Sequence, residues 1–365
     1  MSRRRLLLTA DTVGGVWQYA TELARALAPL DYDVVLALLG PAPSEGQRGA
    51  VADIELVETG LPLDWLAPDA GAVAAAGAAL ARLAADCGAD IVQVNQPALA
   101  ADTRFGVPVV AMAHSCVATW WQAVRGDAPE PADFAWQSAL MQRGLAAADA
   151  IVAPSHAYAA ALHRRYALPA LPDVVHNGRT PLAAPAGALH DFAYTAGRLW
   201  DEGKDVATLD RAAARLGIPF KAAGPTVGPN GQQIRLDHLH ALGRVEERVI
   251  AGCISARPVF VSAARYEPFG LAVLEAALAG CPLVLSDIPT FRELWDGAAL
   301  FVEPGDHAGF ARAIETLVGD VPVRLARGDL ARRHAAHFSP ARMAAAMDGV
   351  YARLLARSAK RGVAA

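Results

Sequence analysis

The sequence predicts an α/β protein of two doubly wound parallel domains. Apolar segments of strand length alternate with segments of helical period, and this alternation occurs twice along the chain. A stretch rich in Pro, Gly and Ala, "HNGRTPLAAPAGALHD" at residues 176–191, separates the two series. A chain of 365 residues that is 54% hydrophobic can bury two cores. We therefore expect a first domain of residues 1–178, joined by a C-terminal helix at 339–365, and a second domain of residues 179–338.

In the first series, we expect buried parallel strands at "RRLLLTA", "DVVLALLG", "ADIVQVN", "VPVVAMAHS" and "ADAIVAPS". Thr21–Leu30 and Ala72–Ala85 have the period of helices. The Ala-rich run Ala67–Ala89 contains an arginine and precedes a strand, which favours a packed helix over a low-complexity segment. The uncharged stretch Phe105–Val124 is as long as a membrane span but is interrupted by polar residues and a proline, so it indicates a buried strand followed by a loop.

In the second series, we expect strands at "DFAYTAG", "IPFKAAG", "RPVFVSA", "CPLVLSD" and "AALFVEP". The chain ends in a long amphipathic segment, for which Ser339 is the expected N-cap and Pro340 the first helical residue. Sheets of this kind bind ligands at the carboxyl ends of their strands. Two such domains facing each other would leave a ligand cleft between them.

The composition excludes several classes of function. A net charge of -4 argues against a nucleic-acid partner, whose binding surface would be basic. The four cysteines are scattered, without a CxxC pair or metal-ligand spacing, which is typical of a reduced cytoplasmic protein. The basic start "MSRRRLLLTAD" carries too short an apolar run for a signal peptide, so it predicts a first strand.

Two carboxylates stand out in "EPFGLAVLEAALAG", residues 267–280. From Pro268 through Ser286 the only charged side chain is Glu275, and Glu267 lies eight residues before it. A buried carboxylate without a partner costs on the order of several kcal/mol even after relaxation. Carboxylates bind vicinal hydroxyls, so a ribose and a sugar would satisfy the two groups. The structural alternative is that Glu275 pairs with a buried arginine and Glu267 caps the helix.

The residues between the two carboxylates predict an anion site. Pro268 suits the first position of a helix, which would leave the backbone N–H groups of Phe269, Gly270 and Leu271 unpaired and available to a phosphate. Gly270 would let the ligand approach the backbone closely.

This segment resembles the E-x7-E motif of retaining GT-B glycosyltransferases of family 4, and the similarity continues through "FGLAVLEAALAGCPLVLSDIPTFRELWDGAALFVEPGD". The resemblance extends over nearly the whole chain. It implies the GT-B fold, with two Rossmann-like domains facing a central cleft and the last helix crossing back to the first domain. It also implies that Glu275 binds the nucleotide ribose, that Glu267 contacts the donor sugar, and that the "FGL" backbone holds the diphosphate.

Arg198 and Lys204 follow the first strand of the second domain, in "AGRLWDEGK". A guanidinium fork and an ammonium together can neutralise a diphosphate, so neither a metal ion nor another cofactor is expected. The family has a "GRL…KG" motif whose Arg and Lys have this role, although this chain reads "EGK" where many members read "EKG". The alternative is a solvated loop with an ion pair between Asp201 and Lys204 or through Glu202.

Three further positions match the family pattern. Gly14 and Gly15 allow close backbone contact at a second helix start, or form an ordinary turn. "LGRV", which contains Arg244, resembles the loop whose backbone contacts the base. His114 ends a strand, where it is either structural or, as the resemblance implies, hydrogen-bonded to the 6-hydroxyl of the transferred sugar. The dinucleotide fingerprint GxGxxG does not occur in the chain.

Aromatic and basic side chains suggest where the other partners bind. Trp120 and Trp121 would stack on an acceptor sugar, or else form an aromatic core under a loop. Four basic residues near the C-terminus would either contact an anionic membrane or lie on a solvated helix face: Arg353, Arg357, Lys360 and Arg361.

Together with the resemblance, these observations predict a metal-independent glycosyltransferase, a hexosyltransferase with Glu267, His114, Arg198 and Lys204 as its catalytic residues. The resemblance implies that the transfer retains the anomeric configuration. The donor would be a UDP-, GDP- or ADP-linked sugar, and the acceptor a carbohydrate, a lipid-linked molecule or a small molecule. We expect a cytoplasmic location, with peripheral contact at the inner face of the membrane as an option. The alternatives are a sugar-nucleotide epimerase of similar fold and a non-catalytic subunit that binds nucleotide sugars.

Overall fold

The computed structural model describes residues 3–183, 187–229 and 231–363. The chain divides into two compact units, the first formed by Met1–Arg179 with Ser339–Ala365 and the second by Thr180–Phe338. The change between units falls within the predicted connection 176–191, of which residues 184–186 lie outside the described residues. Each unit is a parallel sheet covered by helices, so the predicted fold class is confirmed.

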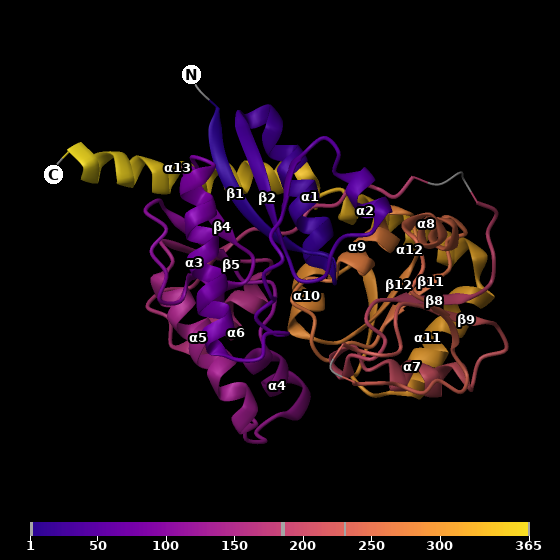
Figure 1. Ribbon diagram of the computed structural model, residues 1–365. Coiled ribbons are helices and arrows are strands. Elements are labelled where there is room, and N and C mark those ends of the chain that lie inside the picture. Colours follow the sequence, from indigo (N-terminus) through magenta and orange to yellow (C-terminus); the bar gives the residue numbers. More distant parts are fainter. Residues whose placement is uncertain (1–2, 184–186, 230, 364–365) are drawn as a thin grey trace. The chain divides into compact units, whose positions relative to one another are not determined.

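The first unit contains a seven-stranded parallel sheet with the order β3-β2-β1-β4-β5-β6-β7. Its central strands β1, β2, β4 and β5 are labelled in Figure 1. Its strands are β1 (Arg4–Asp11), β2 (Tyr32–Leu39), β3 (Glu55–Glu58), β4 (Ile91–Val94), β5 (Val109–Met112), β6 (Ala150–Ala153) and β7 (Asp173–Val174). Its helices are α1 (Gly15–Leu27), α2 (Glu45–Ala50), α3 (Ala70–Asp86), α4 (Val117–Arg125), α5 (Ala135–Ala147), α6 (His156–Tyr166) and α13 (Pro340–Val363), with 3-10 turns η1 (Ala28–Leu30), η2 (Pro97–Ala100) and η3 (Ala132–Phe134). The strand order reverses between β1 and β4, the kind of position at which doubly wound sheets bind ligands.

Both faces of this sheet are buried because its strands are apolar on both sides. Successive residues of β1 alternate between two cores, Leu6 and Leu8 in one and Leu7 in the other. All three are fully buried. The Ala-rich segment forms the packed helix α3, as predicted, and contributes Val73 and Leu80 to the second of these cores.

The last helix belongs to the first unit. α13 begins at Pro340 as predicted, and the Ser339 hydroxyl accepts the Arg342 amide at 3.3 Å. It packs against α1 (Figure 1) and buries Met347 and Tyr351 in the core that contains one face of β1. The segment farthest along the chain therefore completes the first core.

The second unit contains a six-stranded parallel sheet with the order β10-β9-β8-β11-β12-β13. Its strands are β8 (Ala193–Ala196), β9 (Phe220–Ala223), β10 (His240–Gly243), β11 (Val259–Ser262), β12 (Leu283–Ser286) and β13 (Ala299–Val302). Its helices are α7 (Val206–Ala213), α8 (Glu247–Ser255), α9 (Leu271–Leu278), α10 (Pro289–Trp295), α11 (His307–Gly319) and α12 (Val321–Ala335), with a 3-10 turn η4 (Glu202–Lys204). Here the strand order reverses between β8 and β11.

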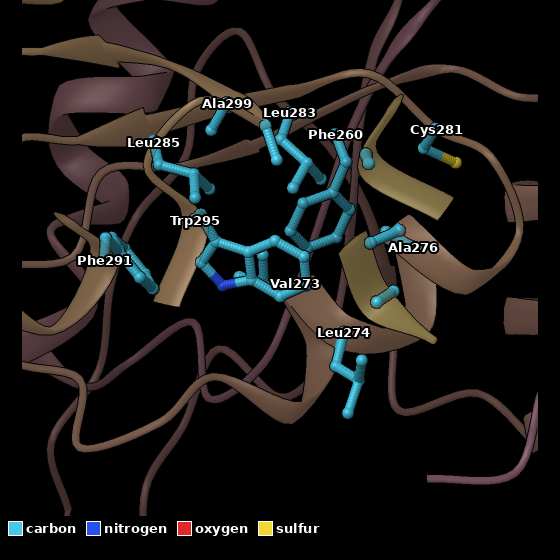
Figure 2. Packing of buried hydrophobic residues seen from close by; sticks show 14 of the residues in the cluster. Phe260, Val273, Leu274, Ala276, Cys281, Leu283, Leu285, Phe291, Trp295 and Ala299 are labelled. Atoms are coloured by element: carbon cyan, nitrogen blue, oxygen red, sulfur yellow. The ribbon is translucent and has the colours of Figure 1, made fainter. Parts of the chain in front are cut away.

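One face of the second sheet packs against α9 and α10. Phe260 and Leu285 extend from the strands toward Trp295, and Val273 of α9 lies beside the indole ring (Figure 2). Trp295 is fully buried and is the largest such side chain among the described residues. This packing fixes α9, in which the predicted site residues Gly270, Leu271 and Glu275 occupy the N-cap, the first turn and the second turn.

Some sequence predictions of structure were wrong. The stretch after β5 is not a loop but helix α4, which starts where the Cys116 sulfur accepts the Thr119 amide at 3.4 Å. Three strands were not predicted: β3, β7 and β10. They are short, lie at or next to sheet edges and are partly exposed, so their sequences lack the continuous apolar run of a central strand.

The four cysteines are free thiols. Within the described ranges, no helix has the length and apolar character needed to cross a membrane.

Candidate functional site

The predicted donor-binding residues of the second unit gather at the carboxyl ends of β8 and β11. Arg198 and Lys204 lie in the segment that follows β8, and Glu267 and Gly270 lie between β11 and α9. These two strands are neighbours in the sheet, although β9 and β10 separate them in sequence. The candidate residues therefore lie at the position where the strand order reverses.

Lys204 and Glu267 are in direct contact. The ammonium of Lys204 donates to Oε2 of Glu267, and the two side chains are 21% and 15% exposed. The structural alternative left open by the sequence was an ion pair of Lys204 with Asp201 or through Glu202; in the structure Lys204 pairs with Glu267 instead. An ammonium has three donors, so Lys204 can hold this carboxylate and still reach a phosphate oxygen.

Backbone hydrogen bonds tie the two loops together and explain this contact. The carbonyl of Gly203 accepts the amides of Arg265 and Tyr266 at 2.9 and 3.1 Å. The Arg265 guanidinium also bonds the Asp205 carboxylate at 2.9 Å. These contacts fix the η4 turn against the loop after β11, which brings together side chains 63 positions apart.

Arg198 is held by its own loop. One end of the guanidinium bonds the Asp201 carboxylate at 2.9 Å, and its carbon lies 5.7 Å from the centre of the Trp200 ring. Asp201 is 6% exposed and also accepts the Gly203 amide at 2.9 Å. The Arg198 side chain keeps 38% exposure, so a fork with five donors is oriented at one end and open at the other.

Helix α9 begins three residues later than predicted. Pro268 is not its first residue, because the helix starts at Leu271 with Gly270 as N-cap in the left-handed region, at φ +93°. The first helical hydrogen bond runs from the Leu274 amide to the Gly270 carbonyl at 3.1 Å. The amides available at the helix start are thus those from Leu271 onward, and the Phe269 side chain is buried in the core.

Glu275 lies in the second turn of α9 and is partly exposed. The fully buried arginine of the second unit, Arg324, does not pair with it: Arg324 bonds the Asp191 carboxylate at 2.7 Å and two backbone carbonyls. Burial raises the pKa of Tyr194, and the nearby Cys253 thiol and Glu275 carboxylate raise it further. The Glu275 carboxylate therefore lies near the neutral Tyr194 hydroxyl of β8.

Glycines end three neighbouring strands of this sheet. Gly197, Gly224 and Gly243 follow or end β8, β9 and β10, with φ of +151°, +137° and +70°. A Cβ on Gly224 would lie 1.7 Å from the Gly197 carbonyl oxygen, so only glycine fits there. This edge exposes backbone rather than side chains, and Arg244, the exposed residue after Gly243, lies beside it.

In the first unit, Gly14 and Gly15 form the turn from β1 into α1. Gly14 is the N-cap, in extended conformation, and nothing lies within 4 Å of a Cβ built on it. The Asp11 carboxylate accepts the Val13 amide at 2.9 Å and so shapes the turn. The first turn of α1 has no side-chain cap; the Trp17 amide bonds the Gly14 carbonyl at 3.2 Å, so the amides of Gly15 and Val16 are those that a ligand could bind.

Besides Asp11, the carboxylate of Asp64 lies near this turn, and the sequence did not mark Asp64 as a candidate site residue. Burial raises the pKa of Asp64 to about 6; the Trp65 amide opposes the shift, and the charge of Asp11 adds to it. Asp64 lies in an irregular segment between β3 and α3, where no periodic pattern marked it.

His114 follows β5, at the carboxyl edge of the first sheet. Its Nε2 lies 3.1 Å from the Asn95 side-chain oxygen, and its ring meets the Tyr19 ring edge-on with centroids 4.5 Å apart. Burial lowers the pKa of His114 to about 3, so the imidazole is neutral near pH 7. Asn95 was not predicted, although the polar Gln93 and Asn95 of "IVQVN" stand out in an apolar strand.

Trp120 and Trp121 lie on α4, with ring centroids 6.3 Å apart. The Trp121 indole donates to the Ala128 carbonyl at 2.8 Å and packs edge-on against Phe134, which agrees with the structural alternative. Trp121 also lines an open pocket of about 340 Å³, together with Ala118, Gln122, Gly126, Asp127, Ala128, Glu130, Arg164 and Arg165. Trp121 can therefore pack under the loop and also contact an acceptor in this pocket, whereas Trp120 is not among the residues that line the pocket.

Comparisons with known proteins address both units. The model of the family described as Glycosyltransferase Family 4 matches residues 13–181, and that of Glycosyl transferases group 1 matches residues 191–320. A search of curated protein sequences finds no significant match.

Solved structures match over nearly the whole chain. Sucrose-phosphate synthase from Thermosynechococcus elongatus is 19% identical, with a TM-score of 0.76 over 97% of this chain and 100% of that one. Anabaena HepE in complex with UDP and glucose is 17% identical, with a TM-score of 0.72 over 96% and 100%. A glycosyltransferase from Rickettsia africae is 15% identical, with a TM-score of 0.70 over 97% and 99%. At these identities the likeness establishes the GT-B fold.

Proposed function

We propose that this chain, whose two parts match models of glycosyltransferase families and which has the GT-B fold, transfers a sugar from a nucleotide-diphosphate sugar to an acceptor hydroxyl. The transfer retains the anomeric configuration and needs no divalent metal. A hexose is the proposed sugar. The second unit binds the donor, and the first unit supplies acceptor contacts.

The observation that carries this proposal is the cluster of Arg198, Lys204, Glu267 and the start of α9 at the carboxyl ends of β8 and β11. Departure of the nucleoside diphosphate places negative charge where these groups lie. The Arg198 fork and the Lys204 ammonium stabilise that charge, and the amides at the start of α9 add fixed dipoles. Because two cations already face the leaving group, a metal ion is not needed for charge neutralisation.

Glu267 and Glu275 bind different groups of the donor. Glu267, held by Lys204, contacts the transferred sugar close to the bond that breaks. Glu275, one turn into α9, accepts hydrogen bonds from the ribose hydroxyls. The base lies against backbone near Gly243 and Arg244, where side chains say little about its identity.

In the proposed reaction, departure of the diphosphate precedes the bond to the acceptor. As the bond from the sugar to the diphosphate breaks, the diphosphate oxygen keeps the electron pair and the sugar becomes oxocarbenium-like. The acceptor hydroxyl then bonds to the same face and passes its proton to the departing diphosphate oxygen. We propose no carboxylate nucleophile. His114 binds a hydroxyl of the sugar, and Gly14 and Gly15 give backbone contacts. The acceptor, whether a carbohydrate, a lipid-linked molecule or a small molecule, binds near the pocket lined by Trp121.

A panel of nucleotide sugars tests the proposal. UDP-, GDP- and ADP-linked hexoses are compared by thermal shift, beginning with UDP-glucose because structures of Anabaena HepE contain it. Products formed with and without acceptor sugars are then identified by mass spectrometry, and their anomeric configuration by NMR. We expect one donor to raise the melting temperature, and to give a retained product in EDTA as fast as with Mg²⁺.

The other functions predict different results in the same assay. An epimerase would convert the nucleotide sugar in the absence of any acceptor. A non-catalytic subunit would show the thermal shift without turnover. Activity lost in EDTA and restored only by a divalent ion would refute the metal-independent mechanism.

We further propose a cytoplasmic location with peripheral membrane contact through α13. Arg357 and Lys360 are exposed on this helix, whereas Arg353 pairs with Asp173 at 2.5 Å; the Arg361 side chain lies outside the described residues. Sedimentation with anionic vesicles tests this contact. Binding that is unchanged when Arg357 and Lys360 are replaced by Gln would refute it.

A further inference from the structure

A chain of hydrogen bonds runs through the core of the first unit and ends at His114. The Tyr351 hydroxyl of α13 donates to the Gln93 side-chain oxygen at 2.5 Å, and the Gln93 nitrogen donates to the Asn95 side-chain oxygen at 3.0 Å. That oxygen lies 3.1 Å from Nε2 of His114. Tyr351 and Gln93 are fully buried, and Asn95 is 4% exposed.

One backbone carbonyl determines which group donates and which accepts in every hydrogen bond of this series. The Asn95 side-chain nitrogen lies 2.5 Å from the carbonyl oxygen of Thr9. The backbone N–H of Asn95 donates to the Thr9 hydroxyl at 2.8 Å. A carbonyl oxygen only accepts, so the nitrogen of the Asn95 amide must face Thr9 and its oxygen must face Gln93 and His114.

The same logic orients Gln93. Its nitrogen must face the Asn95 oxygen, because two oxygens there would repel each other. Its second N–H donates to the Tyr19 hydroxyl at 3.0 Å, and its oxygen accepts from Tyr351. All side-chain donors and acceptors of Gln93 are thereby assigned.

The protonation of His114 follows. The Asn95 oxygen accepts only, so Nε2 of His114 must donate to it. A neutral imidazole carries one N–H, which leaves a lone pair on Nδ1. The depressed pKa of His114 keeps the ring neutral, and the edge-on contact with Tyr19 limits its rotation.

We infer that Asn95 is a positioning residue that fixes His114 as the Nε2–H tautomer, so that Nδ1 accepts a hydrogen bond from a substrate hydroxyl. Tyr351 and Gln93 support Asn95 in this role. The assignment of the tautomer stands on the first unit alone, whereas the identification of the hydroxyl as one on the transferred sugar rests on the proposed function. A substrate that offers fluorine in place of that hydroxyl would direct lone pairs at Nδ1 and be rejected.

Tyr351→Phe is the informative variant, because Tyr351 does not contact His114 directly in the hydrogen-bond series and the substitution removes only a hydroxyl while it keeps the ring. Tyr32→Phe is a matched control. Tyr32 is 1% exposed and its hydroxyl donates to Asp348 of the same helix α13 at 2.7 Å, but it has no bond to Gln93. The Tyr32 hydroxyl also accepts from the Arg4 guanidinium at 2.8 Å, so Tyr32→Phe loses two hydrogen bonds to charged groups and should lower the melting temperature at least as much as Tyr351→Phe.

The primary measurement is NMR of the full chain with ¹⁵N-labelled histidine at pH 7, with His114→Gln used to assign the signals. We expect the wild type to carry the proton on Nε2. Asn95→Ala should mix the two tautomers, and Tyr351→Phe should shift the signals in the same direction while Tyr32→Phe leaves them unchanged. A proton on Nδ1 in the wild type, or equal effects of the two tyrosine variants, would overturn the inference.

Kinetics with the donor selected by the nucleotide-sugar panel gives the second readout. Tyr351→Phe should lower kcat/KM about 3- to 10-fold, the loss of one neutral hydrogen bond, and Tyr32→Phe should not. Donor analogues with each hydroxyl replaced in turn by hydrogen or fluorine should include one position at which fluorine is worse than hydrogen, and Asn95→Ala should remove that difference. Equal tolerance of fluorine and hydrogen at every position would overturn the acceptor role of Nδ1. If no nucleotide sugar supports transfer, the proposed function fails while the NMR result still decides the tautomer.

Discussion

The ion pair between Lys204 and Glu267 should contribute to stability and to catalysis in separable ways. Lys204→Met removes the ammonium but keeps the aliphatic stem, and leaves a carboxylate that is 15% exposed without this partner. Breaking a fully buried pair costs about 3–5 kcal/mol. Because both side chains keep some contact with solvent, we expect about 1–3 kcal/mol here. For a domain of this size, that lowers the melting temperature by roughly 2–12 °C.

A second substitution tests whether that loss comes from the pair itself. Glu267→Gln keeps the shape of the side chain and removes its charge. In the double variant neither charge is left unpaired, so the free energy of unfolding should recover by about 1–2 kcal/mol relative to Lys204→Met. Turnover should not recover, because the departing diphosphate still lacks the ammonium. We expect a loss of about 30- to 1,000-fold, corresponding to 2–4 kcal/mol of transition-state stabilisation.

The assay combines thermal unfolding of the four forms with initial rates of sugar transfer. Lys221→Met is the matched control, because Lys221 lies in the same unit with its ammonium 4.3 Å from the Phe192 ring. It should change stability little and leave turnover intact. If the two stability losses simply add, the side chains do not interact. If the double variant recovers turnover together with stability, Lys204 has only a structural role.

Three other predictions follow from single residues. Glu275→Gln should weaken the binding of a nucleoside diphosphate by about 1.5–3 kcal/mol in calorimetric titration, and an unchanged affinity with a lower melting temperature would mean a structural role. Gly270→Ala should cost about 1–2 kcal/mol of unfolding free energy in a denaturant titration, because φ is +93° and the new Cβ would lie 3.2 Å from the Phe291 ring; unchanged stability would contradict the left-handed cap. Burial raises the pKa of Asp64 to about 6, so the folded state favours the protonated form, and this stabilisation is lost as the pH rises through 6. Asp64→Asn should therefore raise stability at pH 8 by about 1–2 kcal/mol, a value reduced for partial exposure, and change it little at pH 4; equal gains at the two pH values would refute the shifted pKa.

Local sequence pattern was sufficient for the fold class and the central strands, though not for the short edge strands β3, β7 and β10 or for helix α4. The apolar runs of β1 and β8 marked central strands because both faces of such strands are buried, and Ser339-Pro340 marked the start of α13 because capping chemistry is local. The isolated charge of Glu275 and the cations of "AGRLWDEGK" identified candidate donor contacts for the same reason. Chemical type and neighbours along the chain carry that information.

Tertiary structure alone decided how these residues act together. Lys204 meets Glu267 because β8 and β11 are adjacent and Gly203 bonds the loop after β11, and no short-range pattern encodes a contact across 63 positions. The left-handed conformation of Gly270 moved the start of α9 to Leu271, since packing against the sheet fixes where the helix begins. The tautomer of His114 depends on a carbonyl in another strand, because donors and acceptors are assigned by the groups they face in space.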